Sequence, residues 1–455
     1  MLTKHFLPRA YMNREHVGIA EDIIQIPLQV GYMLSWDLWH KSSVISSLDT
    51  GKIYFHNYFF YRKNKMTIGD RIKADEITLA VYNALLKSNL YDITSRDKQL
   101  YSLTYDRYVE YADLPCVLVR VYADENLKDK QEMRIQFDAN QAKAIESDSY
   151  LTILNQALAG IDEDLTVLAP AVKNGWYVYQ IKDSSVNYRI NLADFEVSSK
   201  GFSIYIDGGH KWDLTKQFGA LITGASGTGK TGLLYGLIYQ LLQKDNVEVW
   251  VCDGKNDQLG SVMSQILPKN HVATGVDTAS LIHELVKQTD DRYADMSKKR
   301  KKNSQLAFAN FDKFGYSLIA VFIDEQSAVN ASLSSSKAKK QYQADLLKLV
   351  QTSRSAGIVP IISMQQASAT SLGGNLGTAI REQLSGLRVV MGTESTITTQ
   401  DKQMVFNAGV ELPPNRFSGV GSGYLQTLDM PSPEAFQSPL LLQKSEELYR
   451  LLKRK

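Results

Sequence analysis

The sequence has few cysteines, almost no net charge and no long hydrophobic run, and each of these absences excludes a class of protein. Its 455 residues include only two cysteines, Cys116 and Cys252, which lie far apart in the chain. Two cysteines cannot build a disulfide framework or a zinc knuckle, and their scarcity favours a reducing compartment. With 51 basic and 49 acidic residues the net charge is +2. This excludes a histone-like polycation but allows local basic patches.

Membrane-spanning and targeting patterns are missing as well. The longest apolar stretch, residues 23–34, is interrupted by Gln25, Gln29 and Gly31 and falls short of the ~18 apolar residues that span a bilayer. The N-terminal sequence MLTKHFLPRAYMNREH lacks the apolar core of a signal peptide. We therefore expect no integral membrane segment and a cytoplasmic location.

The rest of the composition, with 44% hydrophobic and 22% charged residues, is that of a globular protein. Alternating apolar residues predict strands over 117–121, 133–137, 175–182 and 188–192, and a helical pattern covers 141–158. We expect a smaller α+β accessory domain over residues 1–196; the alternative is two parts, near 1–110 and 111–196. The aromatic and basic run 53–65 fits a base-stacking platform, a membrane-surface contact or simply a buried strand.

After residue 201 the pattern changes to apolar strands that alternate with helices. The expected strands cover 220–222, 247–252, 318–323, 358–363 and 388–391, and the clearest helix covers 231–242. Because these strands are apolar almost throughout, they indicate a mostly parallel sheet covered on both faces. The fold class is therefore α/β, with a main domain over 197–430 and a C-terminal basic helical tail over 431–455.

Residues 224–231, GASGTGKT, match the phosphate-binding pattern G-x-x-x-x-G-K-[ST]. A predicted strand precedes them and a helix follows, so backbone N–H groups and the helix N-terminus would point at a polyphosphate. Lys230 would reach the β- and γ-phosphates of ATP, and Thr231 would hold Mg²⁺. The residues expected to contact the nucleotide are Gly224, Ala225, Ser226, Gly227, Thr228, Gly229, Lys230, Thr231 and Gly232.

A second acidic motif ends the apolar strand that leads to Asp324 and Glu325. Asp324 would hold the Mg²⁺ ion, and Glu325 would activate the attacking water as a general base. This pairing suits an enzyme that hydrolyses ATP repeatedly. Two solvated acids at a strand end are the alternative, and the phosphate loop makes that alternative much weaker.

Other strand ends supply further candidates. Gln365 ends the strand 358–363 and could contact the attacking water or the γ-phosphate; a buried glutamine that caps the sheet is the alternative. Asp253 and Lys255 could support the Mg²⁺ site or a neighbouring subunit's nucleotide. Arg354 and Arg388, together with Arg381, are candidates for an arginine that reaches a γ-phosphate in trans, although each could be an ordinary surface or interface residue.

These stretches together resemble the FtsK/SpoIIIE family of DNA translocases, most closely the FtsK-like coupling ATPases of Gram-positive conjugative elements. The resemblance covers about 205–428 and rests on GASGTGKT at 224–231, VCDGKND at 251–257, IAVFIDE at 319–325, TSRSAGIVPIISMQQAS at 352–368 and IREQLSGLRVVMGT at 380–393. Gly254 replaces the proline of the family's D-P-K element, and the arginine and proline that follow the family's glutamine are absent after Gln365.

The resemblance implies a RecA-like P-loop ATPase domain, a homo-hexamer, and DNA-stimulated hydrolysis of ATP that moves double-stranded or conjugating DNA without sequence preference. It also suggests a relaxase or a membrane-bound transfer protein as partner, which could recruit the chain to a membrane. DNA contacts are expected in two loops, 330–340 and 369–377, with Lys337, Lys339 and Lys340 as phosphate contacts. Solvated surface loops are the alternative there, and the basic run 298–302 fits a solvated helix face better than DNA contact. Two other functions stay open: an ATPase that moves or remodels protein, and an ATP-gated adaptor.

Overall fold

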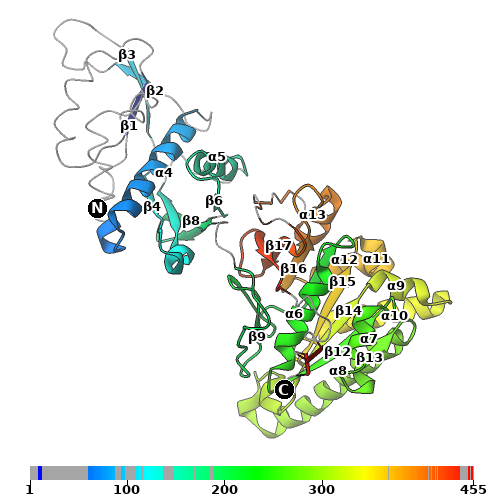
Figure 1. Cartoon of the computed structure of the whole chain (residues 1–455). Coiled ribbons are helices and arrows are strands. Elements are labelled where there is room, and N and C mark those ends of the chain that lie inside the picture. The colour runs from blue at the N-terminus through cyan, green and yellow to red at the C-terminus, as the bar shows by residue number, and fades with distance from the viewer. Residues whose placement is uncertain are drawn as a thin grey trace, which may run out of the picture. The chain divides into compact units, whose positions relative to one another are not determined.

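The computed structural model describes residues 9–12, 60–87, 94–97, 108–113, 116–136, 148–168, 170–183 and 188–440, without 367, 408, 411, 414, 416 and 418, and then 449–450 and 452–453. It divides into two compact units, Met1–Val186 and Asn187–Lys455 (Figure 1). The division lies ten residues before the boundary expected at 196, because residues 188–200 belong to the second unit. None of the described helices is long and apolar enough to cross a membrane.

The described residues of the first unit form two antiparallel sheets. β1 (Arg9–Met12), β3 (Tyr108–Asp113) and β2 (Thr94–Asp97) form a three-stranded sheet in that order. The larger sheet has the order β4-β5-β8-β6, with β7 also paired to β8. Its strands are β4 (Cys116–Arg120), β5 (Glu132–Gln136), β6 (Leu165–Val167), β7 (Ala171–Lys173) and β8 (Trp176–Asp183).

Two helices, α4 (Ile68–Lys87) and α5 (Asp148–Ala159), pack with this larger sheet around one hydrophobic core. The strands predicted near 117–121, 133–137 and 175–182 are confirmed, because their alternating apolar residues face this core. Of the helix predicted over 141–158, residues 141–147 lie outside the described part. Of the run 53–65, residues 60–63 are helical rather than extended, and 53–59 lie outside the described part.

The second unit is built on an eight-stranded sheet with the order β13-β12-β14-β15-β11-β16-β17-β18. The first six of these strands run parallel, whereas β17 is antiparallel to β16 and β18 antiparallel to β17. The strands are β11 (Ala220–Gly224), β12 (Val247–Asp253), β13 (Val272–Thr274), β14 (Leu318–Asp324), β15 (Ile358–Met364), β16 (Leu387–Met391), β17 (Ser422–Thr427) and β18 (Glu434–Gln437). The expected, mostly parallel α/β sheet is thus confirmed.

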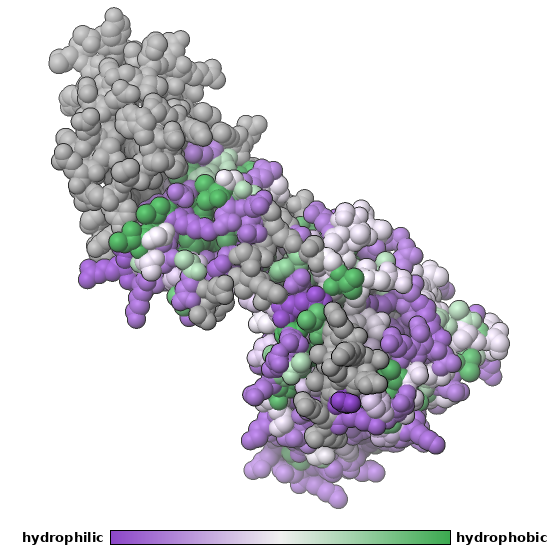
Figure 2. Space-filling view, viewed as in Figure 1, coloured by the Kyte–Doolittle hydropathy of each residue, from purple (hydrophilic) through white to green (hydrophobic). Residues whose placement is uncertain are grey.

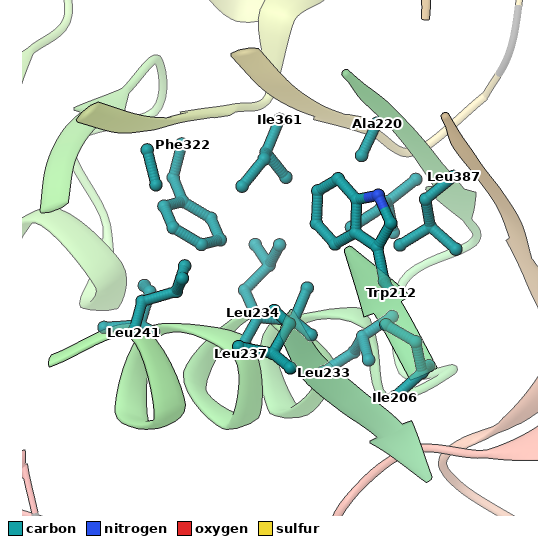
Figure 3. Packing of buried hydrophobic residues seen from close by; sticks show 14 of the residues in the cluster. Ile206, Trp212, Ala220, Leu233, Leu234, Leu237, Leu241, Phe322, Ile361 and Leu387 are labelled. Carbon is teal, nitrogen blue, oxygen red and sulfur yellow. The ribbon is translucent and has the colours of Figure 1, made fainter. Parts of the chain in front are cut away.

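Helices cover both faces of this sheet. On one face lie α6 (Lys230–Leu242), α7 (Gln258–Met263) and the hairpin of β9 (Ser203–Asp207) and β10 (His210–Asp213). Trp212 of β10 and Leu233, Leu234 and Leu237 of α6 pack there against the sheet (Figure 3). On the other face lie α8 (Asp277–Lys302), α9 (Gln326–Ser332), α10 (Ser336–Thr352), α11 (Ala369–Gly373), α12 (Gly377–Gln383) and α13 (Thr399–Phe406). On the face turned to the viewer in Figure 2, hydrophilic side chains cover most of the described surface of this unit.

Two expectations for this unit are wrong. Residues 188–192 form no strand; they carry an isolated bridge from Asn191 to Leu440. Residues 431–455 are not only a basic helical tail, because Glu434–Gln437 pairs with β17 as β18, the last strand of the sheet. Phe436, fully buried, places that strand in the core, which the prolines on either side of it concealed in the sequence.

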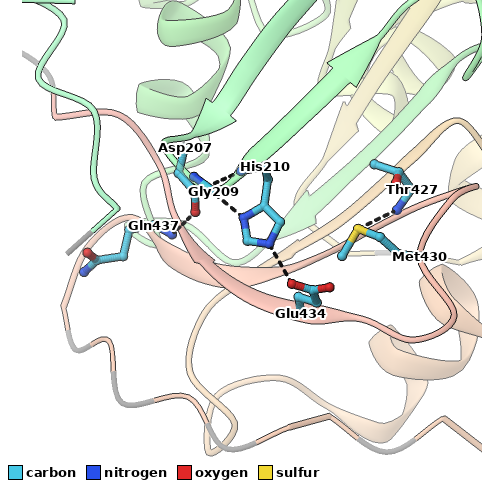
Figure 4. Close-up of polar contacts among 7 residues, drawn as sticks. All are labelled: Asp207, Gly209, His210, Thr427, Met430, Glu434 and Gln437. Carbon is cyan, nitrogen blue, oxygen red and sulfur yellow. Dashed lines mark hydrogen bonds and ion pairs between the residues drawn. The ribbon is translucent and has the colours of Figure 1, made fainter. Parts of the chain in front are cut away.

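A mostly buried histidine ties the hairpin to β18 (Figure 4). His210 Nδ1 lies 2.7 Å from Asp207 Oδ1, and His210 Nε2 lies 3.0 Å from Glu434 Oε2. Burial lowers the pKa of His210, but the two carboxylates outweigh that effect and raise the pKa to about 9. The protonated imidazole can therefore bridge two acids from segments far apart in the chain.

Candidate functional site

The phosphate loop connects β11 directly to α6, as the sequence predicts. β11 ends at Gly224 and α6 begins at Lys230, with Gly229 as N-cap at a φ of 99°. This positive φ disfavours any residue with a side chain. A Cβ at Gly229 would also lie 2.6 Å from the backbone nitrogen of Gly421, too close for the present packing. Gly229 brings no side chain that could cap α6, so the first N–H groups of the helix can meet an anion.

Asp324 and Glu325 follow β14 and meet the lysine of the phosphate loop. Lys230 Nζ donates a hydrogen bond of 2.7 Å to Glu325 Oε1, and both side chains are buried. The Asp324 carboxylate accepts a hydrogen bond from the Ser363 hydroxyl at the end of β15. Burial raises the pKa of Asp324, and the Ser363 hydroxyl and the charge of Lys230 partly offset that effect. The two motifs, 94 positions apart in sequence (230 to 324), thus form one site.

The end of β12 supports this site from the neighbouring strand, where Asp253 is paired in register with Asp324. The Asp253 carboxylate accepts three backbone N–H bonds, from Lys255, Asp257 and Gly260, at 2.8–3.0 Å. Asp253 therefore shapes the turn after β12. Lys255 Nζ lies 3.3 Å from Glu325 Oε2, so lysines from two elements flank the same carboxylate.

The contacts of Gly254 explain why glycine stands here in place of the proline of the D-P-K element in the family that the chain resembles. Its N–H donates to the backbone oxygen of Asp324 at 3.0 Å, a bond that proline cannot make. A Cβ at position 254 would lie 2.6 Å from the backbone oxygen of Glu325. Glu325 itself has a φ of 52°, in the left-handed region. Glycine thus allows close contact between the turn after β12 and the Asp324–Glu325 pair.

The sheet order determines where the other candidates lie. β15 lies between β11 and β14, so Gln365, exposed directly after β15, follows the strand between the two motifs. Arg354 lies before β15, at the edge where the parallel strands begin, and its Nη2 donates to the Lys216 backbone oxygen at 3.0 Å. Arg388 is half-buried within β16, opposite Leu221 of β11. The structure brings neither arginine to the phosphate loop of its own chain, and a role in trans stays a prediction.

The two expected DNA-contacting loops are largely helical, so that part of the expectation is wrong. Lys337, Lys339 and Lys340 lie in the first turns of α10, which begins at Ser336 after the N-cap Ser335. Residues 369–377 form α11, a 3₁₀ turn and the start of α12. Their glycines permit close packing, since a Cβ at Gly373 would lie 2.5 Å from Ile380 Cδ1.

The basic run 298–302 forms the last turns of α8. Lys299 pairs with Asp295, and the Arg300 guanidinium donates to the Ala309 backbone oxygen and stacks over Phe314. Cations at a helix C-terminus also interact favourably with its dipole. These contacts give the basic run a structural role at the end of α8.

Residues 419–422, which we call the glycine loop, reach the site although the sequence reasoning missed them. The Gly421 N–H donates to the Thr228 backbone oxygen of the phosphate loop at 2.9 Å. The side chain of Arg189 donates to the backbone oxygens of Val420 and Ser438 at 3.3 and 3.0 Å. The only signal in the sequence was the glycine-rich segment GVGSG at 419–423.

The residues present fit a magnesium ion held together with a nucleotide. Within the described residues, no group of three or more His, Cys, Asp or Glu side chains could hold a metal ion. Mg²⁺ bound with nucleotide phosphates needs no such group, because phosphate oxygens and water supply most of its ligands. Thr231, in the first turn of α6, and Asp324, at the end of β14, are a hydroxyl and a carboxylate suited to the remaining positions.

No protein-family model and no curated protein matches the chain. Among solved structures, the conjugation coupling protein TcpA of pCW3, a monomer with ATPγS, is similar at 15% identity and a TM-score of 0.46, over 84% of this chain and 99% of that one. EssC (ATPases 2 and 3) from Geobacillus thermodenitrificans is similar at 12% identity and a TM-score of 0.44, over 59% and 51% of the two chains.

The cytoplasmic domain of the type VII secretion ATPase EccC from Thermomonospora curvata is similar at 16% identity and a TM-score of 0.41, over 58% of this chain and 32% of that one. These neighbours are a conjugation coupling protein, the EssC ATPases and a type VII secretion ATPase. At such scores, likeness alone assigns neither an activity nor a substrate to the chain.

Proposed function

We propose that the second unit is a RecA-like P-loop ATPase domain that hydrolyses ATP to ADP and phosphate in order to move DNA. The observation that carries this proposal is the hydrogen bond of 2.7 Å between Lys230 and Glu325, beside Asp324. It unites the lysine of a phosphate loop with an acidic pair at the end of another strand of the same parallel sheet. ATP hydrolysis needs this combination, since the phosphates must be held where a base can reach the attacking water.

Each residue of the site has a distinct role in this proposal. Residues 224–232 hold the phosphates through backbone N–H groups, and Lys230 neutralises their charge. Bound Mg²⁺, held by Thr231 and Asp324, would supply further charge neutralisation. Glu325 accepts the proton of the attacking water, and Gln365, which follows the strand between the two motifs, contacts the water or the γ-phosphate.

The basic start of α10 supports DNA as the substrate. Lys337 and Lys340 are exposed and Lys339 is half-buried, and the first turn of α10 contains no acidic residue. Lysines at a helix N-terminus interact unfavourably with the helix dipole, so an external anion would offset that cost. Phosphate groups of DNA suit such contacts and would be bound without sequence preference.

The wider setting follows the motif resemblance. We propose a homo-hexamer in which Arg354 or Arg388 reaches a neighbouring subunit's nucleotide. We also propose a cytoplasmic location with recruitment to a membrane by a relaxase or membrane-bound transfer protein.

Steady-state ATP hydrolysis with and without long double-stranded DNA, over a salt series, tests this proposal. We expect DNA to stimulate hydrolysis, and the stimulation to fade as salt rises because phosphate contacts release counterions. Replacing Lys337, Lys339 and Lys340 together by serine should abolish most of the stimulation. Lys173→Ser, at an exposed lysine of the first unit, is the matched control and should leave the stimulation intact.

Robust hydrolysis that ignores double- and single-stranded DNA alike would contradict DNA translocation. It would favour the alternative of a protein substrate, while leaving the ATPase assignment in place.

A further inference from the structure

We infer that the glycine loop, residues 419–422, forms the wall of the site that contacts the nucleoside of the bound triphosphate, with the Val420 side chain as the contact surface. This inference rests on the proposed function and extends it. The phosphate loop accounts for the phosphates alone, whereas an enzyme that selects nucleoside triphosphates also needs a surface for the base and ribose.

Sheet topology brings the glycine loop to the phosphate loop. β17 runs antiparallel to β16, so its first residue, Ser422, lies at the edge where the parallel strands end. Gly421 donates its N–H to Thr228 at 2.9 Å, and a Cβ at Gly229 would lie 3.1 Å from Val420 Cγ1. The Val420 side chain therefore borders the N-terminal end of α6, from which a nucleoside would extend.

Val420 is an apolar side chain that is 64% exposed at this position. Nucleotide sites are lined mostly by apolar groups that bury the faces of the base and sugar, with a few polar groups that fix orientation. A bound nucleoside would remove this side chain from water.

Hydrogen bonds to two other segments of the chain hold the glycine loop in place and make it a fixed surface. The backbone oxygen of Gly421 accepts a hydrogen bond of 2.7 Å from the Ser438 N–H, and Arg189 donates to Val420 and Ser438. Gly421 has a φ of 97°, and a Cβ there would lie 2.5 Å from Ser438 Oγ. Contacts to segments before β9 and after β18 thus set the loop in one conformation, as a preorganised binding surface requires.

The test compares ATP with inorganic tripolyphosphate, which carries phosphates but no nucleoside. For Val420→Ser, which removes the apolar contact without adding a charge beside the phosphates, we expect the KM for ATP and the Kd for ATP to rise about tenfold, while kcat and the Kd for tripolyphosphate stay near wild-type values. Val420→Leu, which keeps an apolar contact, should bind ATP nearly as wild type does. Val172→Ser, at a valine 65% exposed in the first unit, is the matched control and should change neither constant.

A KM and Kd for ATP within twofold of wild type in Val420→Ser would overturn this inference alone. An equal loss of tripolyphosphate binding would also overturn it, because that result would mean a distorted phosphate loop. If the wild-type chain bound neither ATP nor tripolyphosphate, the proposed function would fail together with this inference.

Discussion

Single residues at strand ends decide the geometry of the Asp324–Glu325 pair. Gly254 lies against the Glu325 backbone oxygen and donates its N–H to Asp324, so it determines how closely β12 and β14 can end side by side. Glu325 reaches Lys230 and Lys255 from a left-handed backbone conformation. Such a conformation costs about 1–3 kcal/mol and must be held by the surrounding structure.

We therefore expect Gly254→Ala to displace Glu325 and to lower kcat for ATP by at least about tenfold, because the added Cβ would lie 2.6 Å from the Glu325 backbone oxygen. Steady-state kinetics and thermal unfolding measure the effect on activity and stability. Gly69→Ala in α4, where the nearest atom lies 4.0 Å away, should unfold at the same or a higher temperature and keep full activity. Unchanged kcat in Gly254→Ala would show that the close contact does not position Glu325.

The residues that sequence reasoning found and those that it missed differ in how they recognise their partners. Lys230, at the start of a helix, and Asp324 and Glu325, at the end of a strand, belong to motifs whose chemistry demands those residue types, so they can be identified without a structure. Arg189 binds backbone oxygens, which every residue type carries, and Val420 offers an apolar surface, which many residue types could provide. They lie at the site because β17 runs antiparallel to β16, and no local sequence pattern predicts that strand direction.

At the scale of elements, five of the six described parallel strands were predictable because they are almost continuously apolar, whereas β13, only three residues long, was missed. The helices α10, α11 and α12 were missed because serine and glycine near their starts are typical of loops. Here Ser335 caps α10 by accepting the Ala338 N–H, and Ser368 caps α11 in the same way. β18 was missed because it is only four residues long and lies between Pro433 and Pro439.

The histidine bridge between the hairpin and β18 makes stability depend on pH. His210 has a pKa of about 9 in the folded chain against about 6.5 when unfolded, so between these values the folded state binds more protons. The stabilisation is complete below pH 6.5 and is lost as pH rises through 9. We expect the free energy of unfolding to fall by about 3 kcal/mol over this range through His210 alone.

Urea unfolding at pH 6.5 and pH 9 measures this dependence. His210→Gln should lose most of the decrease, whereas His283→Gln, at a side chain that is largely exposed, should retain it. An identical pH dependence in wild type and His210→Gln would show that the imidazole does not carry the charge of the bridge.

At the scale of the whole molecule, the two units differ in how far a sequence explains them. In the second unit, fold and site reinforce each other: the sheet order β14-β15-β11 brings three motifs to one edge, and each motif ends a strand. In the first unit the strands follow from alternation, but its described side chains form a hydrophobic core and partly buried ion pairs without a catalytic motif. A hydrophobic core of this kind allows the fold to be predicted from the sequence, but it indicates no particular chemistry.

The central claim is that Glu325 activates water for the hydrolysis of ATP bound at the phosphate loop, and single-turnover hydrolysis of ATP by Glu325→Gln tests it most directly. Glu382→Gln, at an exposed glutamate of α12, is the control. We predict that Glu325→Gln binds ATP but cleaves it at least about a hundredfold more slowly than wild type, while Glu382→Gln cleaves it normally. Cleavage by Glu325→Gln within a few fold of the wild-type rate would contradict the account.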